Sequence, residues 1–152
     1  MSKTVKRTRS VNKSRKNVKS RSQYNQTNQQ TILLKFLATM NMVKLFHWKT
    51  HSFSTHKATD EVFSQLSGNI DTFVETMMGK HGNRVDLSRM KSISMCDVKN
   101  VEQLRLEMNK FKMFLVNIEQ KLEHTMSNTD LLNIRDEMLG NVNQFLYLLT
   151  LN

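Results

Sequence analysis

The fold is predicted most clearly by residues 101–122, VEQLRLEMNKFKMFLVNIEQKL. Apolar residues recur there at alternating spacings of three and four, namely Val101, Leu104, Met108, Phe111, Leu115, Ile118 and Leu122. This spacing is typical of a helix with one apolar stripe. Because such a stripe has to be buried, the segment predicts a helix that packs against other helices.

Three further segments show the same periodicity. The first helix is expected over residues 31–50, with a stripe of Leu33, Phe36, Met40, Val43 and His47. The second is expected to begin at a cap on Ser54 or Thr55 and to run to Met78, where Gly79 and Gly82 end it, with an apolar face of Thr59, Val62, Phe63, Leu66, Ile70, Phe73 and Met77. The last should begin near Asn128 or Thr129 and bury Leu131, Ile134, Met138, Val142, Phe145 and Leu149.

The composition agrees with an all-α protein. The chain has no proline and 4 glycines in 152 residues, which is too little turn chemistry for a sheet protein, and its length suits one domain. Residues 80–99 lack a clean period and are expected to form a long connection between two helical hairpins. That connectivity is typical of a ferritin-like four-helix bundle, expected here over residues 29–152. The single cysteine, Cys96, is expected to be an ordinary thiol.

Most of the net charge of +10 belongs to the N-terminus. Residues 1–22 contain no acid and nine basic residues: Lys3, Lys6, Arg7, Arg9, Lys13, Arg15, Lys16, Lys19 and Arg21. Residues 1–28 contain few apolar side chains, so a disordered basic arm is predicted. Such an arm could bind DNA or RNA by neutralising phosphates. Nucleic-acid binding is the favoured interpretation, and the alternatives are a solubilising arm, an organelle presequence or a nuclear signal.

A polar stripe lies beside the apolar face of the second helix. His56, Asp60, Asp71 and Glu75 fall within a sector of about 100° on a helix. Carboxylates and imidazole together suit iron. Asp60 and Asp71 should be about 16 Å apart along the axis, so they cannot bind one ion. If two such helices meet antiparallel about a twofold axis, the His56/Asp60 end of one subunit lies against the Asp71/Glu75 end of the other.

These residues resemble the ferroxidase motif of the Dps proteins, the mini-ferritins that protect DNA during starvation. The resemblance is carried by His47-Trp48, then His56 and Asp60, then Asp71 and Glu75, and it covers about residues 30–152. The two histidines are closer in sequence than is usual in that family, and the turn KTHSFST lacks its usual Gly-Pro.

The resemblance implies an iron site with His47, His56 and Asp60 from one subunit and Asp71 and Glu75 from its mate. It also implies Trp48 near the iron as an electron donor, a hollow homo-oligomer of twelve subunits that stores iron mineral, and a basic arm that binds DNA.

Several expectations do not depend on this motif. His51, His81 and His124 have no supporting spacing and are expected at the surface. No apolar run is long enough for a membrane span or a secretory signal, so a soluble protein of the cytoplasm, nucleoid, virion or nucleus is expected, without a membrane partner. The alternative function is a non-enzymatic, nucleic-acid-binding structural protein that keeps the ferritin-like fold. The frequent Asn, Lys and Met suggest an A/T-rich genome, such as that of a large DNA virus.

Overall fold

The computed structural model describes the backbone of residues 5–151 and the side chains of residues 26–151. Its helices are α1 (Val5–Lys49), α2 (Phe53–His81), α3 (Val101–Val116), the short 3₁₀ helix η1 (Ile118–Lys121) and α4 (Thr129–Leu148). The described residues contain no strand. The predicted all-α class is therefore confirmed.

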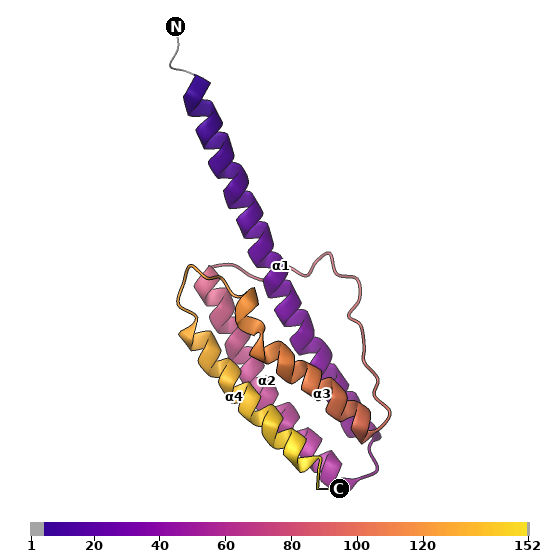
Figure 1. Ribbon diagram of the computed structural model, residues 1–152. Coiled ribbons are helices and arrows are strands. Elements are labelled where there is room, and N and C mark those ends of the chain that lie inside the picture. The colour runs from indigo at the N-terminus through magenta and orange to yellow at the C-terminus, as the bar shows by residue number, and fades with distance from the viewer. Residues whose placement is uncertain (1–4, 152) are drawn as a thin grey trace.

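The helices form two hairpins joined by one long connection (Figure 1). A short turn joins α1 to α2, and η1 with its following loop joins α3 to α4. The connection from α2 to α3 runs back along the length of the bundle, so that α2 and α3 point in the same direction (Figure 1). Each helix then lies beside antiparallel neighbours, with α1 against α2 and α3, and α4 against α2 and α3. The predicted connectivity of the four-helix bundle is confirmed.

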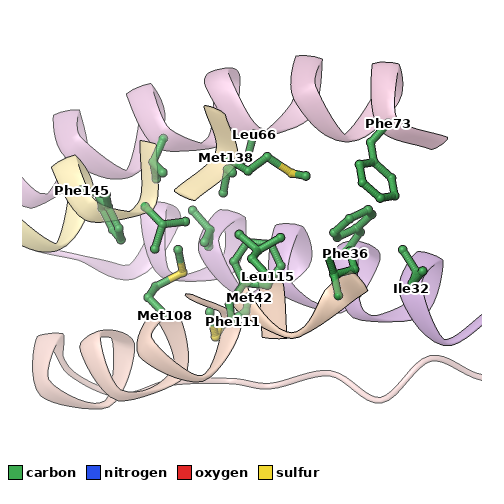
Figure 2. Close-up of a cluster of buried hydrophobic side chains, with 14 of the residues drawn as sticks. Ile32, Phe36, Met42, Leu66, Phe73, Met108, Phe111, Leu115, Met138 and Phe145 are labelled. Atoms are coloured by element: carbon green, nitrogen blue, oxygen red, sulfur yellow. The ribbon is translucent and has the colours of Figure 1, made fainter. Parts of the chain in front are cut away.

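The core contains side chains from all four helices (Figure 2). Phe36 of α1 is fully buried and meets Phe73 of α2 edge to face, with ring centroids 5.4 Å apart. Phe111 of α3 lies 6.2 Å from Phe36 in a similar arrangement. Fully burying an apolar side chain of this kind contributes about 1.5–3 kcal/mol. These contacts hold α1, α2 and α3 at fixed positions relative to one another.

The predicted apolar stripes are largely confirmed. The buried positions include Phe36, Val43, His47, Thr59, Val62, Leu66, Phe73, Met77, Leu104, Met108, Phe111, Leu115, Ile118, Leu122, Leu131, Met138, Val142, Phe145 and Leu149. Others on the stripes, such as Met40, Phe63 and Ile134, are partly buried against this core. Periodicity therefore identified the faces on which the helices meet.

Several helix ends differ from the sequence-based boundaries, and α1 begins at Val5 rather than at residue 31. The cap of α2 is Ser52 rather than Ser54 or Thr55, and its hydroxyl accepts a hydrogen bond from the Thr55 backbone N–H at 3.3 Å. The α-helix predicted over residues 101–122 ends at Val116, because the chain tightens into η1 after Asn117. At its other end, α2 continues past the predicted Met78 to His81, where Gly82 adopts φ 62°, a left-handed conformation that favours glycine, and its N–H bonds to the Gly79 carbonyl.

Polar contacts attach the long connection to the bundle. Lys49 at the end of α1 forms an ion pair with Asp97, and the Gln30 amide donates a 2.6 Å hydrogen bond to the Asp86 carbonyl. Val98 is buried among the core side chains. The connection is thus held near both of its ends.

The basic arm continues α1 past the ends of the other helices (Figure 1). Its backbone is helical from Val5 onward, because neither proline nor glycine interrupts residues 5–49. Helices are stabilised mainly by packing, and this extension projects away from the bundle, so the disorder predicted for residues 1–28 stays a prediction for the protein in solution. No helix in the described part of the chain is both long enough and apolar enough to span a membrane.

Candidate metal centre

The turn between α1 and α2 brings two histidines into contact. His47 lies in the last turn of α1, and His56 lies in the first turns of α2. Their imidazole rings stack with centroids 3.9 Å apart and an angle of 23° between the planes. His47 is buried, with 7% of its surface exposed, and His56 is partly buried. The short separation of the two residues in sequence is therefore compatible with close contact in space.

Hydrogen bonds to backbone carbonyls fix both rings. Nδ1 of His47 lies 3.2 Å from the carbonyl oxygen of His56, and Nδ1 of His56 lies 3.1 Å from the carbonyl oxygen of His47. The His47 carbonyl is one of the last in α1, where helical carbonyls lack a partner within the helix. The His56 imidazole therefore also caps the end of α1.

Thr59 completes the surroundings of His47. Its hydroxyl oxygen lies 3.2 Å from His47 Nδ1 and 2.9 Å from the carbonyl oxygens of both Thr55 and His56. Thr59 is fully buried. The sequence places it correctly on the apolar face of the helix but gives no sign of this contact, which depends on how α1 crosses α2.

Asp60 lies next to the histidine pair. Its Oδ1 atom is 3.9 Å from Nε2 of His47, and its side chain is 59% exposed. A first-row metal ion with bonds of about 2 Å to nitrogen and oxygen can span such a gap. The donor set of imidazole nitrogens and a carboxylate oxygen also suits iron. Within one chain, His47 and Asp60 thus lie close enough for one ion to bind between them.

Asp71 and Glu75 lie farther along α2, on its exposed surface. Eleven residues of helix separate Asp60 from Asp71, so the predicted distance of about 16 Å along the axis applies. No group of three or more His, Cys, Asp or Glu side chains capable of holding a metal occurs among the described residues of one chain. The five predicted ligands therefore do not meet within one subunit, as the geometric argument from the sequence requires.

Trp48 is the predicted electron donor. Its side chain is 68% exposed, and the Lys44 ammonium lies over its ring at 5.8 Å from the centroid. It directly follows His47 and is thus close to the centre in sequence. Its role stays a prediction.

The other histidines divide into two kinds. His51 and His124 are exposed, as predicted. His81 was expected at the surface, and that prediction is wrong: its side chain is only 11% exposed, and its Nδ1 lies 3.4 Å from Oε2 of Glu123. The physical reason is that the loop after η1 folds over the end of α2, which no local spacing reveals.

Lys80 makes further polar contacts at the C-terminal end of α2. Its ammonium donates to the Ser127 carbonyl and, at 2.6 Å, to the Asp130 carboxylate. The hydrogen bond from Lys80 is the main cause that lowers the pKa of Asp130 below its ordinary value of 3.8. The Asp130 side chain is 49% exposed, so this interaction is partly screened by solvent.

The predicted nucleic-acid-binding residues, Lys3, Lys6, Arg7, Arg9, Lys13, Arg15, Lys16, Lys19 and Arg21, lie outside the residues whose side chains are described. A family of unknown function, DUF5856, matches residues 47–149, which contain the candidate centre and the parts of the core that lie on α2, α3 and α4. The chain belongs to this family. The matched region includes all five predicted metal ligands and excludes the basic arm. No curated protein and no solved structure matches the chain.

Proposed function

We propose that this member of the DUF5856 family binds and oxidises ferrous iron at centres shared between two subunits, in the manner of a Dps-like mini-ferritin. The observation that carries the proposal is that His47 contacts His56 by stacking and lies 3.9 Å from the Asp60 carboxylate, at one end of α2. Asp71 and Glu75 would come from a second copy. Iron is here the substrate, and peroxide or oxygen would be the oxidant.

The register of the polar stripe supports a twofold pairing of α2. His56 and Glu75 are equally far from a point between residues 65 and 66, and Asp60 and Asp71 share that same midpoint. One twofold axis at this level would therefore align both pairs at once. The residues exposed near the midpoint include Ser67 and Gly68, whose small side chains permit close approach of a second helix.

The charges on the stripe also support the proposal. Asp71 and Glu75 form no ion pair within the described part of the chain, although lysines and arginines pair with other carboxylates of the bundle. Two neighbouring carboxylates without a counter-ion suit a cation from elsewhere. On oxidation, each ferrous ion would give one electron to the oxidant, and the carboxylates would offset the added positive charge of the ferric product.

The test replaces Asp71 and Glu75, the two ligands that the second subunit would supply. The double variant Asp71→Ala/Glu75→Ala should stay folded, because both side chains are exposed, and should oxidise ferrous iron at least about tenfold more slowly. Absorbance of the ferric product reports the rate, with peroxide and oxygen supplied separately. The matched control is Glu119→Ala/Glu137→Ala, which removes two exposed carboxylates elsewhere. Equal rates in the wild type and both variants would refute the iron centre.

Assembly and storage form the larger part of the same proposal. A twelve-subunit, hollow oligomer would provide room for a ferric mineral, and light scattering on the purified protein measures its size. A monomer would exclude shared centres and so contradict the proposal directly.

The basic arm supports a second activity, which is binding of DNA or RNA. Nine positive charges without an acid would give affinity that is independent of sequence and falls steeply with salt. Deleting residues 2–22 should weaken retention of DNA by about tenfold or more at low salt and flatten its salt dependence. An unaltered binding curve would favour a solubilising or targeting arm. Nucleic-acid binding without iron oxidation would instead favour a structural protein of a virion or nucleoid.

A further inference from the structure

The histidine pair raises the question of which ring nitrogens carry hydrogen. A neutral imidazole has one N–H, and the nitrogen without hydrogen is the one that can bind a metal. Which form is present depends on the partners of the other nitrogen. The contacts of His47 and His56 determine this choice.

Both Nδ1 atoms face groups that accept hydrogen bonds. A backbone carbonyl can only accept, so the contacts of 3.2 Å at His47 and 3.1 Å at His56 are hydrogen bonds only when Nδ1 of each ring carries the hydrogen, which favours that tautomer. The two Nε2 atoms are then left with free lone pairs. At His47, this Nε2 lies on the side of Asp60, at 3.9 Å from its carboxylate.

The Thr59 hydroxyl adds a second, directional constraint on His47. It has one hydrogen and lies 2.9 Å from two carbonyl oxygens, those of Thr55 and His56. Its hydrogen is therefore directed to a carbonyl, and its lone pair faces the Nδ1–H of His47 at 3.2 Å. Because Thr59 is fully buried, no water competes for this lone pair.

We infer that Thr59 is a positioning residue, which holds His47 with Nδ1 protonated and Nε2 open toward Asp60. It acts through His47 and does not itself bind the metal. The inference deepens the proposed function and rests on it for its purpose, whereas the tautomer itself is a property of the metal-free protein. His56 has a carbonyl but no hydroxyl partner on Nδ1, so it provides an internal comparison.

The experiment measures the tautomers without metal. Histidine-selective ¹⁵N labelling and long-range ¹H–¹⁵N correlation spectra at pH about 8.5 distinguish the two neutral forms, since this pH is well above the ordinary titration range of imidazole. The wild type should show His47 and His56 only as Nδ1–H forms. In Thr59→Val, His47 should gain a measurable Nε2–H population, because the Asp60 carboxylate faces its Nε2 and competes with the remaining carbonyl for the hydrogen, while His56 stays unchanged. Thr59→Ser keeps the hydroxyl and should match the wild type.

Binding of Co²⁺, followed by its visible absorption, is the second measurement. Thr59→Val should weaken binding by about tenfold or more, which is typical of losing a residue that orients a metal ligand, and Thr59→Ser should restore it. A wild-type His47 with hydrogen on Nε2, or a folded Thr59→Val protein in which His47 keeps only the Nδ1–H form, would overturn the inference. Failure of iron oxidation in the wild type would refute the proposed function but leave the tautomer result intact.

Discussion

Near each end of α2 lies a histidine with little exposed surface, His47 of α1 at the first end and His81 at the second, and the two make different contacts. At the first end, Nδ1 of His47 and Nδ1 of His56 each lie near a backbone carbonyl, and Nε2 of His47 lies 3.9 Å from the Asp60 carboxylate. At the second end, Nδ1 of His81 faces the Glu123 carboxylate. The carbonyl contacts join His47 and His56 across the turn between α1 and α2, whereas the carboxylate contact joins His81 to the loop after η1. The comparison indicates that two histidines of similarly low exposure can have different kinds of hydrogen-bond partner.

The largest expected effect is a difference in stability between variants at the two ends of α2. His47→Ala removes a buried ring, its stacking on His56 and its hydrogen bonds, and should lower the free energy of unfolding by about 2–4 kcal/mol. His81→Ala removes one polar pair and less buried surface, and should cost about 1–2 kcal/mol. Urea denaturation of both variants measures the difference. Equal losses would show that the first end is no more tightly packed than the second.

The smallest expected effect is the loss, at low pH, of the stability contributed by the ion pair between Lys80 and Asp130. Lys80 lowers the folded-state pKa of Asp130 below 3.8, so this interaction stabilises the fold above that pH and is lost as the pH falls through the folded value. Lys80→Met should therefore reduce stability by at most about 1 kcal/mol at neutral pH, because Asp130 is half exposed.

The stability difference between wild type and Lys80→Met should shrink as the pH is lowered below about 3.8. Thermal unfolding at pH values between 3 and 7, roughly the range over which carboxylates titrate, would follow it. A constant difference across this range would assign the effect of Lys80 to its contact with the Ser127 carbonyl instead.

Much of the fold is predictable because helical periodicity is local. Residues three and four apart lie on one face of a helix whatever surrounds it, so stripes such as the one from Leu104 to Leu115 identify the buried face without a structure. The end of α3 was less predictable. The apolar spacing continues through Ile118 and Leu122, and both are buried, but the backbone tightens into η1 after Asn117.

The candidate site was predicted in part for the same reason. The stripe of His56, Asp60, Asp71 and Glu75 follows from spacing on one helix, and so does the separation that divides it into two halves. Other contacts join different segments of the chain. The stacking of His47 on His56 and the contact of Thr59 with His47 join α1 to α2. The contact of His81 with Glu123 joins α2 to the loop after η1. No spacing rule contains them.

The amino-acid sequence by itself determined the number of helices, their buried faces, the long connection and the register of the polar stripe, since each of these depends on the repeat of a single helix. Only the tertiary structure decided which side of each imidazole is occupied and which is open. That choice depends on the angle and depth at which α1 meets α2, and these are set by the packing of side chains such as Phe36 and Phe73 far from the site.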